Sequence, residues 1–514
     1  MPFFVRRALA FDQSLVQIQE GSTDLAEAFL RNHWCSLICS VRAAALLLTL
    51  ALAGCAAHAP VIRAPAAPAA APSLTAAIDQ LIDQGCYHCL ERAYDESVAA
   101  ADPIRTFETA LLLTARAKEL GLPFAPWLDR ARAATPPGAD WLDYLAIVQA
   151  LRIDPVADDR DVILVDTLKN RASAETVAGW RTDLAAGAGS PVLRAYLELS
   201  LICQYVVQDR NVTIAEAVQR FHDVPLIEYR AGACGSAQAP HLAAVRETVP
   251  EFADVDFALG RYAADIPQQP DQDEALRRFT AARAAFPESP AIVANLAALR
   301  RDREEWADAL EAYDATLGLV PTHRDALLGR VVTLSHLARY DDAIASATRI
   351  LDLGSWFTGE AYYWRAWNAY HLARIDEARA DTDKAKGLMH NAPVLVLSGM
   401  IEWHEHRLDE SEAELQDALT LDAGQCEAAF LLGSVRAEQR QWASGAAAFE
   451  LAQRCYDLSV TLRRETIARI TAGPGSDEGK ARLIARQQRA MTEEVQHRDE
   501  AAENAVRLQK RAGV

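Results

Sequence analysis

Cys86 and Cys89 are separated by two residues, which is the spacing that thiol–disulfide oxidoreductases use. Those enzymes place the pair after a strand and at the N-terminus of a helix, where a thiolate is stabilised. No strand-helix-strand pattern surrounds this pair, no haem-attachment histidine follows Cys89, and no second cysteine pair completes a zinc site. The sequence therefore favours a structural or dormant pair, and disulfide exchange is a separate hypothesis.

Four further cysteines form two local pairs. Cys203 precedes Cys234 by 31 residues, and Cys426 precedes Cys455 by 29 residues. The two antiparallel helices of one hairpin would bring cysteines at these separations side by side. Together with the first pair they give an even number, which suits an oxidising compartment. We therefore predict one disulfide between Cys203 and Cys234 and another between Cys426 and Cys455.

The elements that carry these residues are predicted to be helices from Leu74 onward, because apolar residues recur every three or four positions. In the second half a small residue recurs with successive spacings of 34, 34, 35, 33 and 34 residues. Its six positions are Ala275, Ala309, Ala343, Ala378, Ser411 and Gly445. In several units a bulky residue follows four positions later: Phe279, Tyr313, Leu415 and Phe449.

This pattern resembles the tetratricopeptide repeat, in which small residues let two helices pack closely and bulky residues contact the next unit. The resemblance covers residues 251–457 as about six units, with Gly399 and Gly433 at the small position of the first helix. An insertion around residues 265–272 departs from the family pattern. The resemblance implies an all-α fold, a right-handed α-solenoid of helix-turn-helix repeats.

The rest of the chain divides around this array. We predict a leader and signal over 1–54, an Ala/Pro tether over 55–75, diverged helical repeats over 76–250, about six regular units over 251–458, and C-terminal capping helices over 459–514. Within the last part, a charged helix follows the break at residues 473–476 and carries a thin apolar stripe that ends in Val506 and Leu508. Covering the open face of the last repeat is the favoured role for this helix, and a partner-binding coiled coil is the alternative.

In solenoids of this family the first helix of each unit lines a concave groove that binds ligands. The repeat register places nine side chains there: His336, Tyr363, Trp367, Tyr370, His371, Met400, Trp403, His404 and Phe430. The Lys, Arg and Asn residues of the carboxylate-clamp members, which grip a peptide C-terminus, are missing from these positions. We therefore expect the groove to bind apolar peptide side chains or the faces of sugar rings, unless these aromatics only pack between repeats.

Three of those residues, His336, His371 and His404, fall on one repeat position in consecutive units. Adjacent units are offset by roughly 10 Å, which is too wide for ligands that lie about 2 Å from one ion. The histidines could make binding pH-sensitive, although a chance alignment on a solvated face is the favoured interpretation. Since residues 403–406 also lack the H-E-x-x-H spacing, we predict no metal site, no cofactor and no enzymatic activity.

The stretch from Arg42 to Cys55 ends in Leu-Ala-Gly-Cys and resembles the lipobox of bacterial lipoproteins. A basic lead, a short apolar run and small residues before a cysteine are typical of a secretory signal rather than a membrane span. The resemblance implies that the chain is cut before Cys55 and that this cysteine carries lipid. The residues after Cys55, with no Asp, imply the periplasmic face of the outer membrane. Residues 1–40 extend unusually far upstream, so Val41 is a candidate start.

The charge of the chain narrows the choice of partner. It carries 52 Lys+Arg against 71 Asp+Glu, a net charge of −19. An acidic surface of this size disfavours nucleic acid and disfavours direct adsorption to anionic lipid, so membrane attachment is expected through the lipid anchor alone. The sequence predicts a lipid-anchored periplasmic scaffold that binds an envelope protein or peptide segment during envelope assembly. A glycan- or peptidoglycan-binding module, or an accessory subunit of an envelope enzyme, is the alternative.

Overall fold

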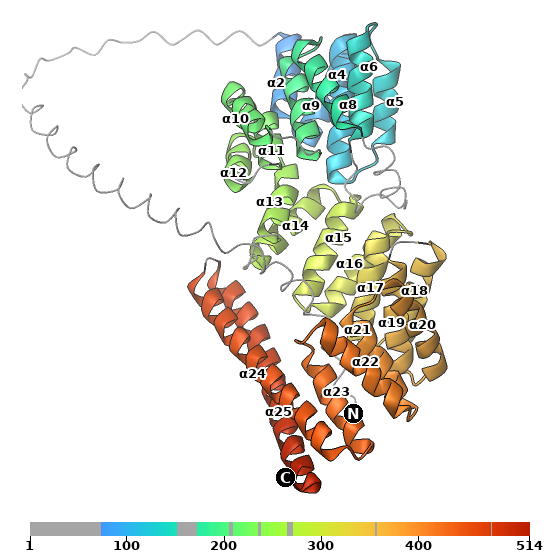
Figure 1. Ribbon diagram of the computed structural model, residues 1–514. Helices are drawn as coiled ribbons and strands as arrows, with labels where there is room; N and C mark the ends of the chain where they lie inside the picture. Colours follow the sequence, from blue (N-terminus) through green and yellow to red (C-terminus); the bar gives the residue numbers. More distant parts are fainter. Residues whose placement is uncertain are drawn as a thin grey trace, which may run out of the picture. The chain divides into compact units, whose positions relative to one another are not determined.

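The computed structural model describes residues 73–151, 172–204, 209–234, 238–264, 271–354, 357–473 and 475–513. The predicted signal, Cys55 and nearly all of the tether lie outside these residues, as does most of the predicted insertion at 265–272. Every regular element that the structure describes is an α-helix (Figure 1). Judged by length and hydropathy, none of the helices in these ranges could cross a bilayer.

The region before the regular repeats contains ten described helices of uneven length. They are α2 (Leu74–Gln84), α3 (Tyr87–Ala99), α4 (Pro103–Leu120), α5 (Ala125–Ala133), α6 (Ala139–Ala150), α8 (Ala174–Ala186), α9 (Pro191–Gln204), α10 (Arg210–Arg220), α11 (Pro225–Gly232) and α12 (Gln238–Thr248), followed by α13 (Asp254–Ala264), which opens the array. Ser73, Asp102 and Ser173 cap three of them, because each side chain accepts a hydrogen bond from a backbone amide of the first turn.

The regular array consists of six helix pairs. The first pair is α13 with α14 (Gln272–Ala285), and the others are α15 (Pro290–Asp302) with α16 (Trp306–Leu319), α17 (Arg324–His336) with α18 (Tyr340–Asp352), α19 (Thr358–His371) with α20 (Ile375–Leu388), α21 (Ala392–His404) with α22 (Leu408–Leu421), and α23 (Cys426–Glu438) with α24 (Trp442–Ala472). Each helix packs on the next one along the chain, within and between pairs. This is the helix-turn-helix solenoid that the repeat period predicts.

One backbone turn recurs inside these pairs. The residue that ends the turn has a positive φ of 55–62° in five consecutive pairs, at Glu304, Ala338, Ala373, His406 and Arg440. In each case the following amide donates a hydrogen bond of 2.9 Å to the carbonyl oxygen five residues back. This is the Schellman closure of a helix C-terminus, made here without glycine. The repeat therefore fixes the geometry of the turn as well as the contacts between helices.

Close packing within the pairs depends on small residues. A Cβ atom added to Gly433 would lie 2.8 Å from the ring of Phe449, and one added to Gly399 would lie 2.8 Å from Leu415. Glycine at these two positions lets the first helix approach the bulky residue of the second helix. The fixed spacing of small and bulky residues in the sequence therefore has a direct steric cause.

A buried charged network holds the N-terminal helices together. The Arg116 side chain is fully buried, pairs with Asp254 and Glu119, and lies 3.9 Å from the ring centre of Tyr229. Glu119 also accepts a hydrogen bond of 2.8 Å from the Tyr196 hydroxyl. Burial opposes the charge of Arg116, but the surrounding phenol and carboxylate groups raise its pKa above the ordinary value. These contacts connect α4, α9, α11 and α13.

A second buried charge, Lys118, stabilises the end of α6. Its Nζ donates hydrogen bonds of 2.8–3.1 Å to the carbonyl oxygens of Val148, Gln149 and Leu151. These are carbonyl groups that the end of a helix leaves without intrahelical donors. Burial lowers the pKa of Lys118 to about 8. The N-terminal region thus depends on specific polar contacts between residues that are distant in sequence.

The structure has no break between helices at residues 458 and 459, where the sequence predicts the boundary between the array and the capping helices. Helix α24 runs without a break from Trp442 to Ala472, so the second helix of the last pair and the predicted next helix are one element. Helix α25 (Asp477–Ala512) packs along α24. Leu508 of the predicted stripe is buried, but Val506 is 49% exposed.

Helix α25 also contacts the beginning of the array, which the capping prediction did not include. Arg482 pairs with Asp273 of α14, and Arg486 and Arg489 approach the Glu304 carboxylate at 3.1 and 2.9 Å. The other half of the helix contacts the last pair, where Gln509 donates a hydrogen bond of 2.6 Å to Glu450. Helix α25 therefore bridges the first and last parts of the array.

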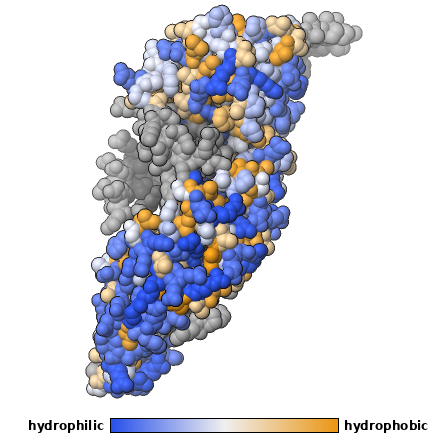
Figure 2. All heavy atoms as spheres, turned by 90° about the vertical axis from the view of Figure 1, so that its right-hand side faces the viewer, coloured by the Kyte–Doolittle hydropathy of each residue, from blue (hydrophilic) through white to orange (hydrophobic). Residues whose placement is uncertain are grey.

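The described surface is mostly hydrophilic. On the face drawn in Figure 2, hydrophilic residues cover most of the described surface, and the apolar residues form small separate patches. The net charge of −19 gives this surface an excess of carboxylates, many of which pair with arginine within the described ranges. A carboxylate that already pairs with an arginine is less available to a ligand, so acidic residues without such an ion pair are the better candidates for a binding site.

Candidate functional site

Three first helices of consecutive pairs, α19, α21 and α23, carry eight of the nine predicted groove residues. Helix α19 contacts α21, and α21 contacts α23. Tyr363, Trp367, Tyr370 and His371 lie on α19, Met400, Trp403 and His404 on α21, and Phe430 on α23, whereas His336 lies on α17. We call the side formed by these side chains of α19, α21 and α23 the first-helix face.

The predicted residues differ in their access to solvent. Four are buried, with exposed fractions of 3% for Tyr363, 6% for Trp367, 6% for Met400 and 5% for Phe430. Four others are half-buried, namely His336, Tyr370, His371 and Trp403. His404 is exposed. The sequence therefore overestimates the open aromatic surface, because packing around α19, α21 and α23 covers four of its nine side chains. The alternative, that some of these aromatics only pack against neighbouring helices, agrees with the burial of Tyr363, Trp367 and Phe430.

The aligned histidines have a packing cause. The His336 ring stacks on Trp306 with ring centres 4.0 Å apart, and the His371 ring stacks on Tyr340 at 5.0 Å. Both aromatic partners begin the second helix of the preceding pair. His336 and His371 are thus half-buried against aromatic rings, whereas His404 is exposed. Across the described ranges, no group of His, Cys, Asp or Glu is arranged to hold a metal ion.

Glu427, in the first turn of α23, is the residue that the sequence did not single out. Its Oε1 atom is buried and has no hydrogen-bond partner within the described part of the chain, and the same holds for the Tyr363 hydroxyl. Burial raises the pKa of Glu427 to about 8. Burial also raises the pKa values of Tyr363 and Tyr370, and the nearby Glu427 carboxylate raises both further. Glu427 and the two tyrosines therefore share one environment on the first-helix face.

A single sequence signal could have drawn attention to Glu427. It lies three residues before Phe430, so both residues are on one side of α23. However, an acidic residue in the first turn of a helix is common, because the helix dipole favours negative charge there. The residue type alone therefore did not distinguish a binding carboxylate from an ordinary helix start.

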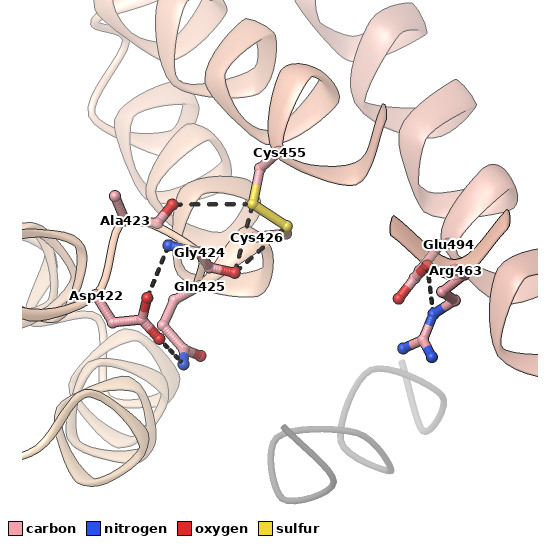
Figure 3. The surroundings of a disulfide bond; sticks show 8 residues. All are labelled: Asp422, Ala423, Gly424, Gln425, Cys426, Cys455, Arg463 and Glu494. Carbon is pink, nitrogen blue, oxygen red and sulfur yellow. Dashed lines mark hydrogen bonds and ion pairs between the residues drawn. A yellow bond between two sulfur atoms is a disulfide. The ribbon is translucent and has the colours of Figure 1, made fainter. Parts of the chain in front are cut away.

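The disulfide between Cys426 and Cys455 fixes the helix start that carries Glu427 (Figure 3). Its Cα atoms are 5.3 Å apart, and it joins the first residue of α23 to α24. In the preceding turn, the Asp422 carboxylate accepts hydrogen bonds of 2.8 Å from the Gly424 amide and 2.7 Å from the Gln425 side chain. These contacts hold the backbone on the N-terminal side of Glu427. The disulfide joins the two helices of one hairpin, α23 and α24, as the spacing of the two cysteines predicts.

The other two cysteine pairs are also bonded in the structure. Cys86 and Cys89 lie at the start of α3 with exposed fractions of 2% and 4%, so a substrate disulfide has little access to their sulfur atoms. This burial favours the structural role. Cys203 on α9 bonds to Cys234, which follows the end of α11. Because α10 lies between α9 and α11 in the chain, this disulfide does not join the two helices of one hairpin, contrary to what the separation of 31 residues suggested.

Comparison with known proteins gives structural similarities only. No protein-family model matches the chain, and no curated protein matches it. Among solved structures, the chain is similar to YrrB, which is described as a TPR protein with an unusual peptide-binding site. The identity is 22% and the TM-score is 0.30, and the match covers 34% of this chain and 91% of that chain. A tetratricopeptide repeat protein from Parabacteroides merdae is 17% identical, with a TM-score of 0.36 over 54% and 98% of the two chains. Yeast Tom70 is 12% identical, with a TM-score of 0.33 over 82% and 94%.

The class of the protein follows from its own repeat. The period of 33–35 residues, the six antiparallel helix pairs and the small-to-bulky contacts at Gly399 and Gly433 define a tetratricopeptide-type, all-α repeat protein.

Proposed function

We propose that this protein is a scaffold that binds a protein partner through the first-helix face, and that it has no catalytic role of its own. The observation that carries the proposal is the combination of half-buried aromatic rings with a carboxylate that has no partner, on three adjacent helices. Tyr370 and Trp403 provide rigid amphipathic rings of the kind that anchor interfaces. A rigid repeat array presents such groups to an extended segment without rearrangement.

We further propose that lipid on Cys55 anchors this scaffold to the periplasmic face of the outer membrane. The support is the resemblance of residues 42–55 to a lipobox, the Ala/Pro tether that follows it, and three cysteine pairs of a kind that persists in an oxidising compartment. A Pro-rich tether extends by about 3.1 Å per residue, so it would hold the helical part tens of ångströms from the bilayer.

Co-purification after crosslinking in envelope extracts tests the partner. We expect the wild-type chain to enrich one envelope protein that is lost when Tyr370 and Trp403 are both replaced by alanine. Leu142→Ala on the N-terminal helix α6 is the matched control, because Leu142 is 61% exposed but lies outside the first-helix face. Equal enrichment by all three proteins would argue against the proposed site.

The anchor has its own test. We expect Cys55→Ala to abolish labelling by a fatty-acid analogue and to release the helical part from the membrane fraction. Labelling that survives the substitution would exclude Cys55 as the lipid site. Peptides from residues 1–40 in the precursor would likewise exclude a start at Val41.

The glycan-binding alternative requires an aromatic ring with one accessible face. Of the two predicted groove tryptophans, Trp367 is 6% exposed and Trp403 is half-buried, so Trp403 is the one on which a sugar ring could stack. Retention on a peptidoglycan column that disappears in Trp403→Ala, without an enriched protein, would favour this alternative over the scaffold.

A further inference from the structure

Two polar atoms on the first-helix face have no hydrogen-bond partner among the residues that the structure describes. They are the hydroxyl oxygen of Tyr363, whose side chain is 3% exposed, and Oε1 of Glu427. Neither side chain forms a hydrogen bond or an ion pair within the described ranges. Leaving such groups buried and unsatisfied is costly, and native proteins do so rarely. This pair therefore indicates a site that something outside the described chain completes.

A cationic N–H group would complete this site, because it can donate to the buried Oε1 atom of Glu427 and to the Tyr363 hydroxyl oxygen, which receive no hydrogen bond from the described residues. The Glu427 carboxylate is destabilised by burial, and no basic side chain of the described ranges compensates it. Nearby acids differ, because Glu412 pairs with Arg436 at 2.9 Å and Glu414 pairs with Lys386. Glu427 is therefore set apart from acids of the same array that already have a partner.

The surroundings suit a cation with an apolar stem. Tyr370 is half-buried, lies near enough to Glu427 for this carboxylate to raise its pKa, and packs edge-on against His404 of the next pair with ring centres 6.2 Å apart. The faces of tyrosine and tryptophan rings attract ammonium and guanidinium groups, and their bodies bury methylene groups. An arginine side chain offers both parts, and its five donors could satisfy a carboxylate and a phenol oxygen together.

We propose that the first-helix face binds an arginine side chain of an extended basic segment, with Glu427 as its counter-ion and the Tyr363 hydroxyl as a second acceptor. This proposal rests on the proposed scaffold function and names the chemistry of the partner. The excess of carboxylates on the protein would steer such a segment toward the site, but only Glu427 and Tyr363 would distinguish it from other basic peptides.

The Cys426–Cys455 disulfide positions this site. Cys426 directly precedes Glu427, and the bond ties the first turn of α23 to α24. Removing it would let this turn fray, because the ends of helices open more easily than their interiors. The disulfide therefore acts as a positioning element and does not contact the ligand.

Peptide binding to the full exported chain tests the proposal. The probe is a dye-labelled hexaarginine peptide, compared with a hexacitrulline peptide of the same shape and no charge, in fluorescence anisotropy at 150 mM salt. We expect Glu427→Gln to weaken hexaarginine binding at least tenfold and Tyr363→Phe to weaken it a few-fold. Glu438→Gln is the matched control, since this exposed acid on the same helix should change the affinity less than twofold. Hexacitrulline should not bind.

Two results would overturn the site. Equal affinities for the wild type, Glu427→Gln and Glu438→Gln would show non-specific attraction to an acidic surface, and equal binding of both peptides would show that charge is irrelevant. Circular dichroism of each variant reports whether it is folded. If Glu427→Gln still enriches the envelope partner that the Tyr370 and Trp403 variant loses, the scaffold function stands and the arginine site fails. Cys426→Ser with Cys455→Ser should weaken binding by less than Glu427→Gln does.

Discussion

The helices before α13 and the helix pairs that follow it are stabilised by different chemistry. In the N-terminal region, Arg116 reaches Asp254, 138 residues away, and Lys118 reaches the end of α6. In the array, neighbouring helices approach at small residues such as Gly399 and Gly433, and the same turn recurs in five pairs. The first arrangement depends on a few specific contacts, and the second depends on a repeated steric pattern.

This difference separates stability from binding. In the N-terminal network the buried charged side chains form ion pairs with one another: Arg116 pairs with Glu119 and Asp254, and Arg230 pairs with Glu119. The small-to-bulky contacts between neighbouring helices of the array, such as Gly399 with Leu415 and Gly433 with Phe449, do not involve the polar atoms of Tyr363 and Glu427. A unit that packs only on its neighbours can therefore carry a binding carboxylate without loss of the fold.

The largest expected effect comes from Arg116→Met. Removing one partner of a buried ion pair leaves an uncompensated charge, here Asp254, and typically costs about 3–5 kcal/mol. Hydrogen exchange should show faster local opening of α4, α11 and α13 together, since the network connects them. Arg132→Gln, which removes an exposed ion pair with Asp129, is the control and should change stability by less than about 1 kcal/mol.

A smaller loss is expected from Gly433→Ala. The added methyl group would lie 2.8 Å from Phe449, and overpacking of this kind costs about 1–3 kcal/mol. The faster exchange should be confined to α23 and its neighbours, in contrast to the spread expected for Arg116→Met. Gly387→Ala has open space around the added methyl group and should stabilise α20 by up to about 1 kcal/mol. Equal effects of the two substitutions would contradict the steric explanation.

Glu427→Gln should change how stability depends on pH. The pKa of Glu427 is about 8 in the folded protein against an ordinary 4.5, so the folded state holds the proton more tightly. The stability linked to this proton is fully present below pH 4.5 and is lost as pH rises toward 8. We expect the wild type to lose roughly 1–3 kcal/mol across this window that the glutamine variant keeps. Parallel unfolding curves from pH 5 to 8.5 would contradict the burial of this carboxylate.

The smallest effect is expected where α25 reaches the beginning of the array. Glu304→Gln removes the carboxylate that Arg486 and Arg489 approach, at partly exposed positions where ion pairs contribute about 0.2–1 kcal/mol. Hydrogen exchange in the first half of α25 should rise at low salt, and the difference should vanish in 1 M salt because of screening. Glu500→Gln, at an exposed position in the second half of α25, is the control and should leave this exchange unchanged.

The sequence predicted the array well because its determinants are local and repeated. Small and bulky residues at fixed spacings, such as Gly433 and Phe449, specify helix pairs without knowledge of the rest of the chain. It did not predict the Arg116–Asp254 pair or the reach of α25 to Asp273, since each joins residues far apart in sequence that carry no shared pattern.

The candidate site was predicted only in part. The repeat register named Tyr370 and Trp403, which the structure places half-buried on α19 and α21, because the face of a helix follows from its period. Burial of Tyr363 and Trp367 depends on the packing around α19, α21 and α23, and a single sequence does not give it. The sequence did not single out Glu427 for a related reason. Its distinguishing property is a buried Oε1 atom without a hydrogen-bond partner in the described residues, and this depends on the positions of all the neighbouring side chains.

Site-specific photo-crosslinking in cells tests most directly whether the array binds and the N-terminal helices do not. A photoreactive phenylalanine at Trp403, on the first-helix face, is compared with one at Leu142, which is exposed on α6. We expect one discrete adduct with an envelope protein at position 403 that disappears in Glu427→Gln, and no adduct at position 142. A discrete adduct at 142 with none at 403 would contradict the assignment of binding to the first-helix face.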